Sequence, residues 1–215
     1  MELNFDSLHN ERKNFVNANN MHDHVYVAGT LPVLISAPHG VSQVRLGKFK
    51  VAEIGSLTTA LFLKKITNSH LIAKTQNNND DANFDDESQY KNHIKEIIKS
   101  KSIKFILDFH GLAAHRVCDV NIGTHLGDNI LSNKRAYIML VKLLENNGLV
   151  VSVDQPFMAG VKTICSSIKK EFPEIWSLQI EINCAITNKK ENFEKFKKLL
   201  FSLIDWFKFI ENGRF

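Results

Sequence analysis

Hydrophobic and polar positions alternate in blocks along this chain, and the blocks predict strands and helices in turn. Short apolar runs are typical of buried strands, whereas apolar positions one helical turn apart are typical of amphipathic helices. The predicted strands cover residues 25–29, 33–37, 70–74, 103–109, 117–123, 149–153 and 176–183. The predicted helices cover residues 51–67, 87–100, 133–147 and 192–210. Strands that alternate with helices predict an α/β fold with one central sheet covered on both faces.

The pattern predicts one domain over residues 1–215. A chain of 215 residues, 44% of them hydrophobic, is long enough to bury one sizeable core. The first two predicted strands are joined by a short turn at Gly29. Residues 75–88, TQNNNDDANFDDES, are polar and rich in turn formers, so we expect a loop there.

Two histidines follow apolar runs and precede glycines. His39 lies in LISAPHG after one predicted strand, and His110 lies in LDFHG at the end of another. Ligand sites in such folds gather at the carboxyl ends of strands, and each glycine is expected to leave room for a ligand near the backbone. Neutral imidazoles are common zinc ligands, and a catalytic zinc keeps three protein ligands and one open position. A third ligand is therefore expected.

Glu53 and Asp108 compete for the place of the third ligand. Glu53 opens the predicted helix directly after the loop that begins at His39, so its carboxylate can face the same sheet edge. Asp108 shares a strand face with His110, where it is either a ligand or the acceptor that orients an imidazole. Glu53 is the preferred ligand.

A third polar group lies in the last predicted strand. Gln179, Glu181 and Asn183 alternate with apolar residues and so share one face. An edge strand with one wet face would explain them, and so would a functional cleft. In a cleft, Glu181 can act as a general base towards an activated water and then protonate a leaving amine.

Composition narrows the class of protein. The net charge of +4 is mild, and no basic, aromatic-rich face or basic amphipathic helix predicts nucleic acid or a membrane surface as partner. The start of the chain lacks the pattern of a signal peptide, and no apolar run is long enough to span a membrane. The odd count of cysteines, without CxxC spacing, indicates reduced thiols in a cytoplasmic protein.

The ordered motifs LISAPHG, DFHG, QPFMAG and LQIEIN resemble those of the N-formylglutamate amidohydrolase family, over roughly residues 31–187. That family is similar in fold to zinc carboxypeptidases and aspartoacylase, which implies a mixed central sheet flanked by helices. The resemblance implies hydrolysis of the amide bond of a small acidic N-acyl amino acid, with one Zn²⁺ ion. By position, it implies metal ligands His39, Glu53 and His110 and the catalytic acid/base Glu181.

The resemblance also implies residues that contact substrate. DDANFDD matches an Asp-x-Asn segment with Asp81 and Asn83, and DQPFMAG matches a substrate loop that contains Gly160. We expect Gln179 and Asn183 to bind substrate as well.

One departure from the family pattern concerns the residue that binds the anionic group of the substrate. Phe84 stands where close relatives carry an arginine, so another basic residue has to take that role. Arg116 and Lys162 are the nearest candidates by motif position, and Arg45 is a third; Arg116 is also expected to stabilise the oxyanion.

Two other functions remain open. One is a metallopeptidase-like hydrolase that acts on γ-glutamyl or cell-wall peptide fragments. The other is a domain of this fold that binds a metal or ligand without catalysis, which would have little need for a carboxylate at Glu181. The oligomeric state is not predicted.

Overall fold

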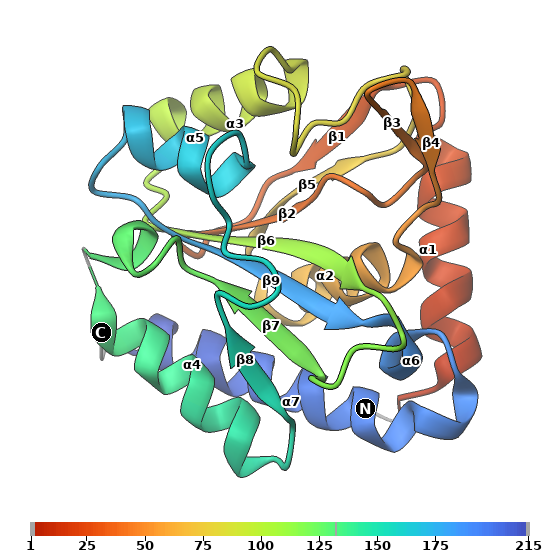
Figure 1. Cartoon of the computed structure of the whole chain (residues 1–215), viewed down its shortest axis with the longest axis vertical. Coiled ribbons are helices and arrows are strands. Elements are labelled where there is room, and N and C mark those ends of the chain that lie inside the picture. The colour runs from red at the N-terminus through yellow and green to blue at the C-terminus, as the bar shows by residue number, and fades with distance from the viewer. Residues whose placement is uncertain (1–2, 132, 214–215) are drawn as a thin grey trace.

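A mixed sheet organises the computed structural model, which describes residues 3–131 and 133–213 (Figure 1). Within those ranges the sheet has seven strands in the order β1-β5-β2-β6-β9-β7-β8. The pairs β1–β5 and β7–β9 are antiparallel, and the other four pairs are parallel. The α/β architecture with a mixed central sheet is therefore confirmed. The strands are β1 (His24–Val27), β2 (Val33–Ala37), β5 (His70–Lys74), β6 (Phe105–Leu112), β7 (Val120–Gly123), β8 (Val151–Val153) and β9 (Trp176–Asn183).

Helices cover both faces of the sheet. The α-helices are α1 (Phe5–Asn19), α2 (Ile54–Thr67), α3 (Gln89–Ser100), α4 (Lys134–Asn146), α5 (Ile164–Glu171), α6 (Cys184–Thr187) and α7 (Phe193–Glu211). Two short 3₁₀ helices, η1 (Asp128–Ile130) and η2 (Lys190–Asn192), and a hairpin of β3 (Gln43–Arg45) and β4 (Lys48–Lys50) complete the described elements. In the described ranges, no helix is both long and apolar enough to cross a membrane.

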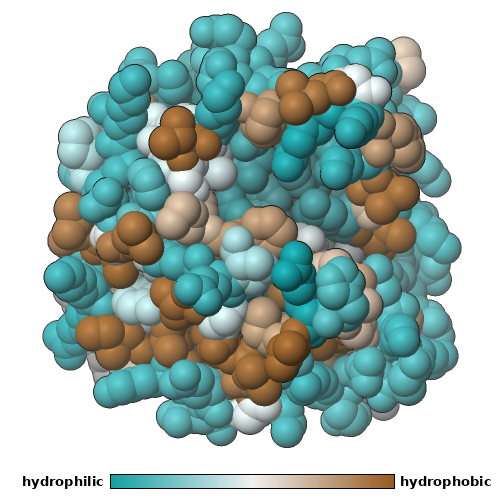
Figure 2. All heavy atoms as spheres, in the orientation of Figure 1, coloured by the Kyte–Doolittle hydropathy of each residue, from teal (hydrophilic) through white to brown (hydrophobic). Residues whose placement is uncertain are grey.

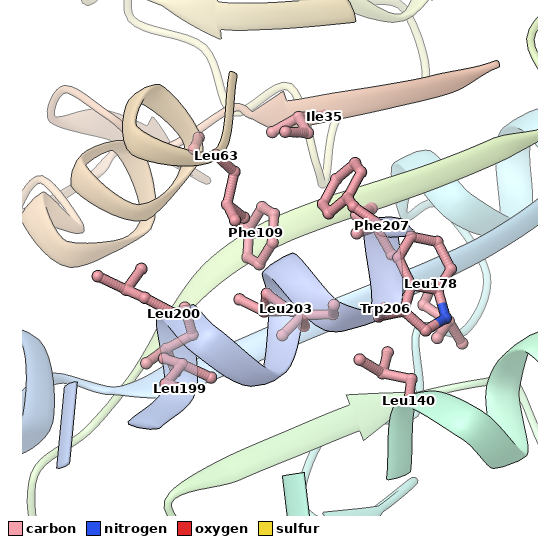
Figure 3. Close-up of a cluster of buried hydrophobic side chains, with 14 of the residues drawn as sticks. Ile35, Leu63, Phe109, Leu140, Leu178, Leu199, Leu200, Leu203, Trp206 and Phe207 are labelled. Atoms are coloured by element: carbon pink, nitrogen blue, oxygen red, sulfur yellow. The ribbon is translucent and has the colours of Figure 1, made fainter. Parts of the chain in front are cut away.

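The alternation of side chains along the strands divides the core in two. In β2, Val33 and Ile35 pack in the larger apolar cluster, with residues of α2, α4 and α7. Leu34 packs in the smaller cluster, with residues of α3 and α5. Leu203 and Trp206 of α7 lie at the centre of the larger cluster (Figure 3). Helices α2, α4 and α7 thus cover the sheet face of the larger cluster, and α3 and the short α5 cover part of the face of the smaller cluster.

The first two predicted strands do not form a hairpin. β5 lies between β1 and β2 in the sheet, so the short connection at Gly29 crosses over a neighbouring strand. A Cβ atom at Gly29 would lie 2.3 Å from the backbone of Asn68 and Ser69, which explains the glycine. The edge-strand explanation of residues 176–183 is wrong, because β9 lies between β6 and β7 and is buried along its whole length.

Several elements lie where the sequence predicted none. α1 buries only Leu8, so its hydrophobic periodicity is weak, although Asn4 caps it by accepting a hydrogen bond from the amide of Ser7. The hairpin β3–β4 turns at Leu46 and Gly47, which both have positive φ. Hydrophobic residues reach the surface in separate groups among hydrophilic ones (Figure 2), as is usual for globular proteins.

Candidate metal centre

The polar side chains of three central strands lie on the sheet face that α3 and α5 cover incompletely. Parallel pairing places Ser36 beside Asp108, Asp108 beside Gln179, and His110 beside Glu181. Their apolar neighbours in β6 and β9, such as Phe109 and Ile180, point to the opposite face and into the larger cluster. His110 lies inside β6 and not after it, because this strand continues to Leu112.

His39 and Glu53 are brought together by the loop between β2 and α2. Only Pro38 separates His39 from the end of β2, and Glu53 immediately precedes the first turn of α2. The backbone amide of Glu53 donates to the carbonyl of His39 at 2.9 Å, which closes the loop at its base. The Glu53 side chain makes no capping hydrogen bond to its own helix, so its carboxylate is free to face the histidines.

The ligand atoms of His39, Glu53 and His110 lie within 4.8 Å of one another, and they are the only such group of metal-binding type among the described residues. The two Nδ1 atoms are 3.1 Å apart, and Nδ1 of His39 is 2.9 Å from Oε1 of Glu53. Oε2 of Glu53 accepts from the amide of Gly111 at 2.8 Å and lies 3.5 Å from Nδ1 of His110. The arrangement therefore offers two nitrogen atoms and a carboxylate to one ion.

Each histidine is oriented by a second, fully buried carboxylate. Nε2 of His39 donates to Asp81 at 2.9 Å, and Nε2 of His110 donates to Asp108 at 2.9 Å. Ser36 holds the other oxygen of Asp108 at 2.6 Å. A carboxylate behind an imidazole fixes the tautomer and raises the basicity of the opposite nitrogen, as it does behind metal ligands. Of the two candidates for third ligand, Glu53 thus faces the two Nδ1 atoms and Asp108 orients His110.

The charges of these groups are strongly coupled. Burial alone would lower the pKa of His39, but the Glu53 charge and the hydrogen bonds to Asp81 and Glu53 outweigh it and raise that pKa to about 9. For His110, Asp108 and Glu53 outweigh burial in the same way and raise the pKa well above its ordinary value. The histidines in turn hold the pKa of Glu53 well below the usual range, against its burial. The site thus stabilises positive charge between its carboxylates.

Glu181 lies in the same pocket, and its pKa is shifted in the opposite direction to that of Glu53. Its side chain is buried, and burial together with the Glu53 charge raises its pKa to about 7, although His110 and His39 pull it down. Gln179 donates to Oε1 of Glu181 at 2.7 Å and accepts from Nδ2 of Asn83 at 3.2 Å. Asn83 accepts in turn from the amide of Ile164 at 2.8 Å, so the start of α5 is tied to the catalytic candidate. A carboxyl group with a pKa near neutrality is suited to both accept and donate a proton.

These groups open into a pocket of about 560 Å³. The predicted residues that line it are His39, Arg45, Glu53, Asn83, His110, Lys162, Gln179 and Glu181. Arg45 donates to Asp81 at 2.7 Å, and both Arg45 and Lys162 lie over the ring of Phe84, 5.1 and 5.5 Å from its centroid. The residue that replaces the expected arginine is thus flanked by two cations.

Four predicted residues lie outside the pocket lining. Arg116 is exposed in the loop after β6, and its carbonyl accepts from the side chain of Asn183. Asn183 also donates to the carbonyl of Cys118 and accepts from the amide of Ala185, so its side chain holds the end of β9. Gly160 accepts hydrogen bonds from Thr163, while the residues after it line the pocket. Asp81 is buried behind His39 and does not line the pocket.

The two glycines after the histidines make room for the protein's own side chains. A Cβ atom at Gly40 would lie 2.7 Å from the side chain of Leu57, and one at Gly111 would lie 3.0 Å from Cβ of Glu53. The expectation that Gly40 clears space for a ligand is therefore wrong. Gly111 instead admits the Glu53 carboxylate.

Sequence reasoning missed Lys50 as a lining residue. Lys50 ends the β3–β4 hairpin and is exposed at the mouth of the pocket. The only signal was the short alternation QVR and KFK around Leu46-Gly47, which lacks the Asn-Gly or Asp-Gly pair that usually marks such a turn.

The mixed seven-stranded sheet covered by helices on both faces is a carboxypeptidase-like fold. No known protein family matches the sequence, and no curated protein does. Solved structures share the fold. An N-formylglutamate amidohydrolase from Ralstonia eutropha JMP134 is 13% identical, with 89% of this chain and 99% of that one covered and a TM-score of 0.62.

Two further solved structures show how widely the fold is shared. A bacteriophage poly-gamma-glutamate hydrolase is 13% identical over 89% of each chain, with a TM-score of 0.51. A metallo-carboxypeptidase from Burkholderia cenocepacia is 11% identical, over 95% of this chain and 69% of that one, with a TM-score of 0.53. The expected likeness to this group of hydrolases is thereby confirmed at the level of the fold.

Proposed function

We propose that this protein is a zinc-dependent amidohydrolase that cleaves the amide bond of a small acidic N-acyl amino acid, such as N-formylglutamate. The observation that carries the proposal is the orientation of the two imidazoles. Asp81 and Asp108 engage both Nε2 atoms, which directs both Nδ1 atoms to Glu53. Purely structural histidines need no such pair of buried acceptors behind them.

The donor set suits a zinc ion. Two imidazole nitrogens and one carboxylate, with an open pocket beside them, match the protein ligands of many catalytic zinc sites. When bound, zinc supplies Lewis acidity, which activates a water molecule and polarises the scissile carbonyl. His39, Glu53 and His110 are the ligands in this proposal, and Asp81 and Asp108 keep the imidazoles in the binding tautomer.

Glu181 moves the proton. Its raised pKa, near 7, lets the carboxylate accept a proton from the attacking water and return it to the leaving nitrogen. Gln179 holds Oε1 of Glu181, so the proton is expected on the other oxygen, Oε2. A domain that only binds a ligand would gain nothing from burying this carboxyl group beside Glu53, which argues against the non-catalytic alternative.

Positive charge at the pocket mouth supports an acidic substrate. Arg45, Lys50 and Lys162 line the pocket, and we assign the carboxylate of the substrate to this group. Arg45 uses Nε on Asp81, which leaves its two terminal nitrogens for the substrate. Arg116 is not assigned a role here, because it lies outside the lining.

Metal analysis combined with a substrate screen tests the proposal. The zinc content of purified protein is measured before and after supplementation, for the native chain and for His39→Ala and the control His115→Ala, which is exposed in the loop after β6. We expect about one zinc per native and control chain, and a loss of zinc in His39→Ala. N-formyl- and N-acetyl-glutamate should be hydrolysed faster than their leucine analogues. Unchanged zinc content in His39→Ala would refute the metal site.

A second candidate substrate class is γ-glutamyl or cell-wall peptide fragments. The fold shared with a poly-gamma-glutamate hydrolase favours it over unrelated amides. The same screen, extended to γ-glutamyl dipeptides and muropeptides, separates the two classes by their kcat/KM values.

A further inference from the structure

The pocket that holds the candidate metal ligands has a cationic end. Arg45 and Lys162 both line the pocket and both lie over the ring of Phe84, which lines it too. We call these three residues the cationic end. Asn83, which precedes Phe84, donates to Gln179 at 3.2 Å, so this end lies beside the part of β9 around Gln179. The proposed function assigns the carboxylate of the substrate to this end.

Another part of the same pocket is lined without charged side chains. It is formed by the start of α2, the end of β6 with the residue after it, and α6 with its C-cap. We call it the uncharged end, and its lining residues are Ile54, Gly55, Leu112, Ala113, Cys184, Thr187 and Asn188. These segments are in contact, since Gly55 has no room for a Cβ atom against Thr187, and Leu112 pairs with the residue before Cys184.

Strand β9 runs from the cationic end to the uncharged end and passes the candidate ligands on the way. Gln179 lies at the cationic end, and Asn183 directly precedes Cys184 of the uncharged end. Glu181 lies between them and pairs with His110. A strand rises about 3.3 Å per residue, so Gln179 and Asn183 are about 13 Å apart. The two ends are therefore separated along the strand, with His110 between them.

The loop between β2 and α2 shows the same order. Arg45 donates to Asp81 at 2.7 Å, and Asp81 accepts from Nε2 of His39 at 2.9 Å. On the other side of that imidazole, Nδ1 lies 2.9 Å from Glu53, and Ile54 is the next residue along the chain. The cationic end thus adjoins the Nε2 side of His39, and the uncharged end adjoins Glu53.

Two apolar side chains of the uncharged end belong to neither cluster of the core. Leu112 is only 1% exposed and shares a face of β6 with His110, and Ile54 is half-buried. Neither packs in the larger or the smaller apolar cluster. They therefore offer apolar surface to a ligand in the pocket. Each methylene group that a ligand buries there should tighten its binding about fourfold.

We propose that the acyl group of the substrate is an apolar chain longer than formyl, and that this chain occupies the uncharged end. The inference rests on the proposed function. With the acidic amino acid at the cationic end, the scissile C–N bond lies beside Glu181 and the candidate ligands. Hydrolysis breaks that bond: the oxygen of water bonds to the acyl carbon, which leaves as an apolar carboxylate, and the nitrogen takes up a proton and leaves as the amine of the amino acid. A formyl group has no chain to place in the uncharged end.

Binding without turnover tests the inference. The full-length Glu181→Gln protein, with and without added zinc, is titrated by calorimetry with N-formyl-, N-acetyl-, N-butyryl- and N-hexanoylglutamate. We expect butyrylglutamate to bind about tenfold more tightly than acetylglutamate, because it buries two more methylene groups. Ala113→Trp, added to this protein, fills the uncharged end and should bring the ratio of the two Kd values close to one. The matched control is Ala114→Trp, which is exposed in the same loop and outside the pocket lining, and it should leave the ratio unchanged.

The thiol of Cys184 gives a second measurement, which reports where the acyl chain lies. Cys118 and Cys165 are buried, whereas Cys184 is half-buried and lines the uncharged end. The Glu181→Gln protein is labelled with iodoacetamide, and the modified cysteines are identified by mass spectrometry. Saturating N-butyrylglutamate should slow the labelling of Cys184, and saturating N-formylglutamate should not.

Three results would overturn the inference: no binding or equal Kd values at every chain length, a length effect that survives Ala113→Trp, or labelling of Cys184 that butyrylglutamate leaves unchanged. Hydrolysis of N-formylglutamate by the native protein, together with any of these results, would leave the amidohydrolase proposal standing and remove the acyl site. Length-dependent binding by a zinc-loaded native protein that hydrolyses no member of the series would refute the amidohydrolase proposal and keep the uncharged end as a binding site.

Discussion

Glu181→Gln removes one ionisable proton from the pocket and little else. The glutamine has the same shape, and its amide oxygen can accept the hydrogen bond that Gln179 donates to Oε1. Only the capacity to carry a charge and to move a proton is lost. The substitution therefore separates the electrostatic cost of the carboxylate from its proposed catalytic use.

The expected gain in stability follows from the shifted pKa. In the folded, metal-free protein the pKa of Glu181 is about 7, against an ordinary value of 4.5, mainly because of burial. The folded state therefore keeps this proton while the unfolded state releases it, so the stability that the group contributes falls as pH rises from 4.5 to about 7. One pKa unit corresponds to 1.36 kcal/mol, so at about pH 8 the glutamine variant should be more stable by about 3 kcal/mol. At about pH 5 the difference should be below about 1 kcal/mol.

Urea unfolding of chelator-treated protein at the two pH values measures this difference, with the exposed Glu145→Gln of α4 as control. The same variant, loaded with zinc, should lose about 10²–10⁴-fold in kcat, which is the usual range for a general acid–base group. A variant that is no more stable at pH 8 than at pH 5 would refute the reasoning about burial. A variant that turns over substrate at the native rate would refute the proton-transfer role.

Zinc affinity should depend steeply on pH, because His39 has a pKa of about 9 and must lose its proton to bind a metal. Below that pH the affinity should fall at least about tenfold for each pH unit. Competition with a chelator at several pH values measures this slope. A flat profile would contradict this. Asp81→Asn should weaken zinc binding by about 10–100-fold, whereas the exposed Asp205→Asn should not. Leu203→Ala, at the centre of the larger apolar cluster, should cost about 2–5 kcal/mol of unfolding free energy, and the half-exposed Phe201→Ala less. Equal effects of these two substitutions would contradict the assigned burial.

Much of the architecture was predictable because buried segments show a hydrophobic pattern within their own stretch of sequence. The seven predicted strands and four long helices were all found, since each buries an apolar run or stripe whose period can be counted. α1 and α5 were not predicted, for two different reasons. α1 buries too little apolar surface to show a strong period, and α5 is short and follows a loop of irregular backbone.

The candidate site was predictable in part for a similar reason. His39 and His110 each stand at the end of an apolar run, and Glu181 interrupts a buried one, so their chemistry contrasts with their surroundings. The order of the strands in the sheet does not show in the sequence in this way. That β6 and β9 are neighbours, and that their register sets His110 beside Glu181, depends on pairing between segments far apart in the chain.

By itself, then, the sequence indicated which residues are candidates for the chemistry and which segments are buried, because both depend on the residues and their immediate neighbours. Only the tertiary structure placed Glu53 beside the two Nδ1 atoms, Asp108 and Asp81 behind the two imidazoles, and Arg116 outside the pocket lining. Those outcomes depend on distances between side chains of different elements, and such distances are set by how the sheet pairs and how the helices pack on it.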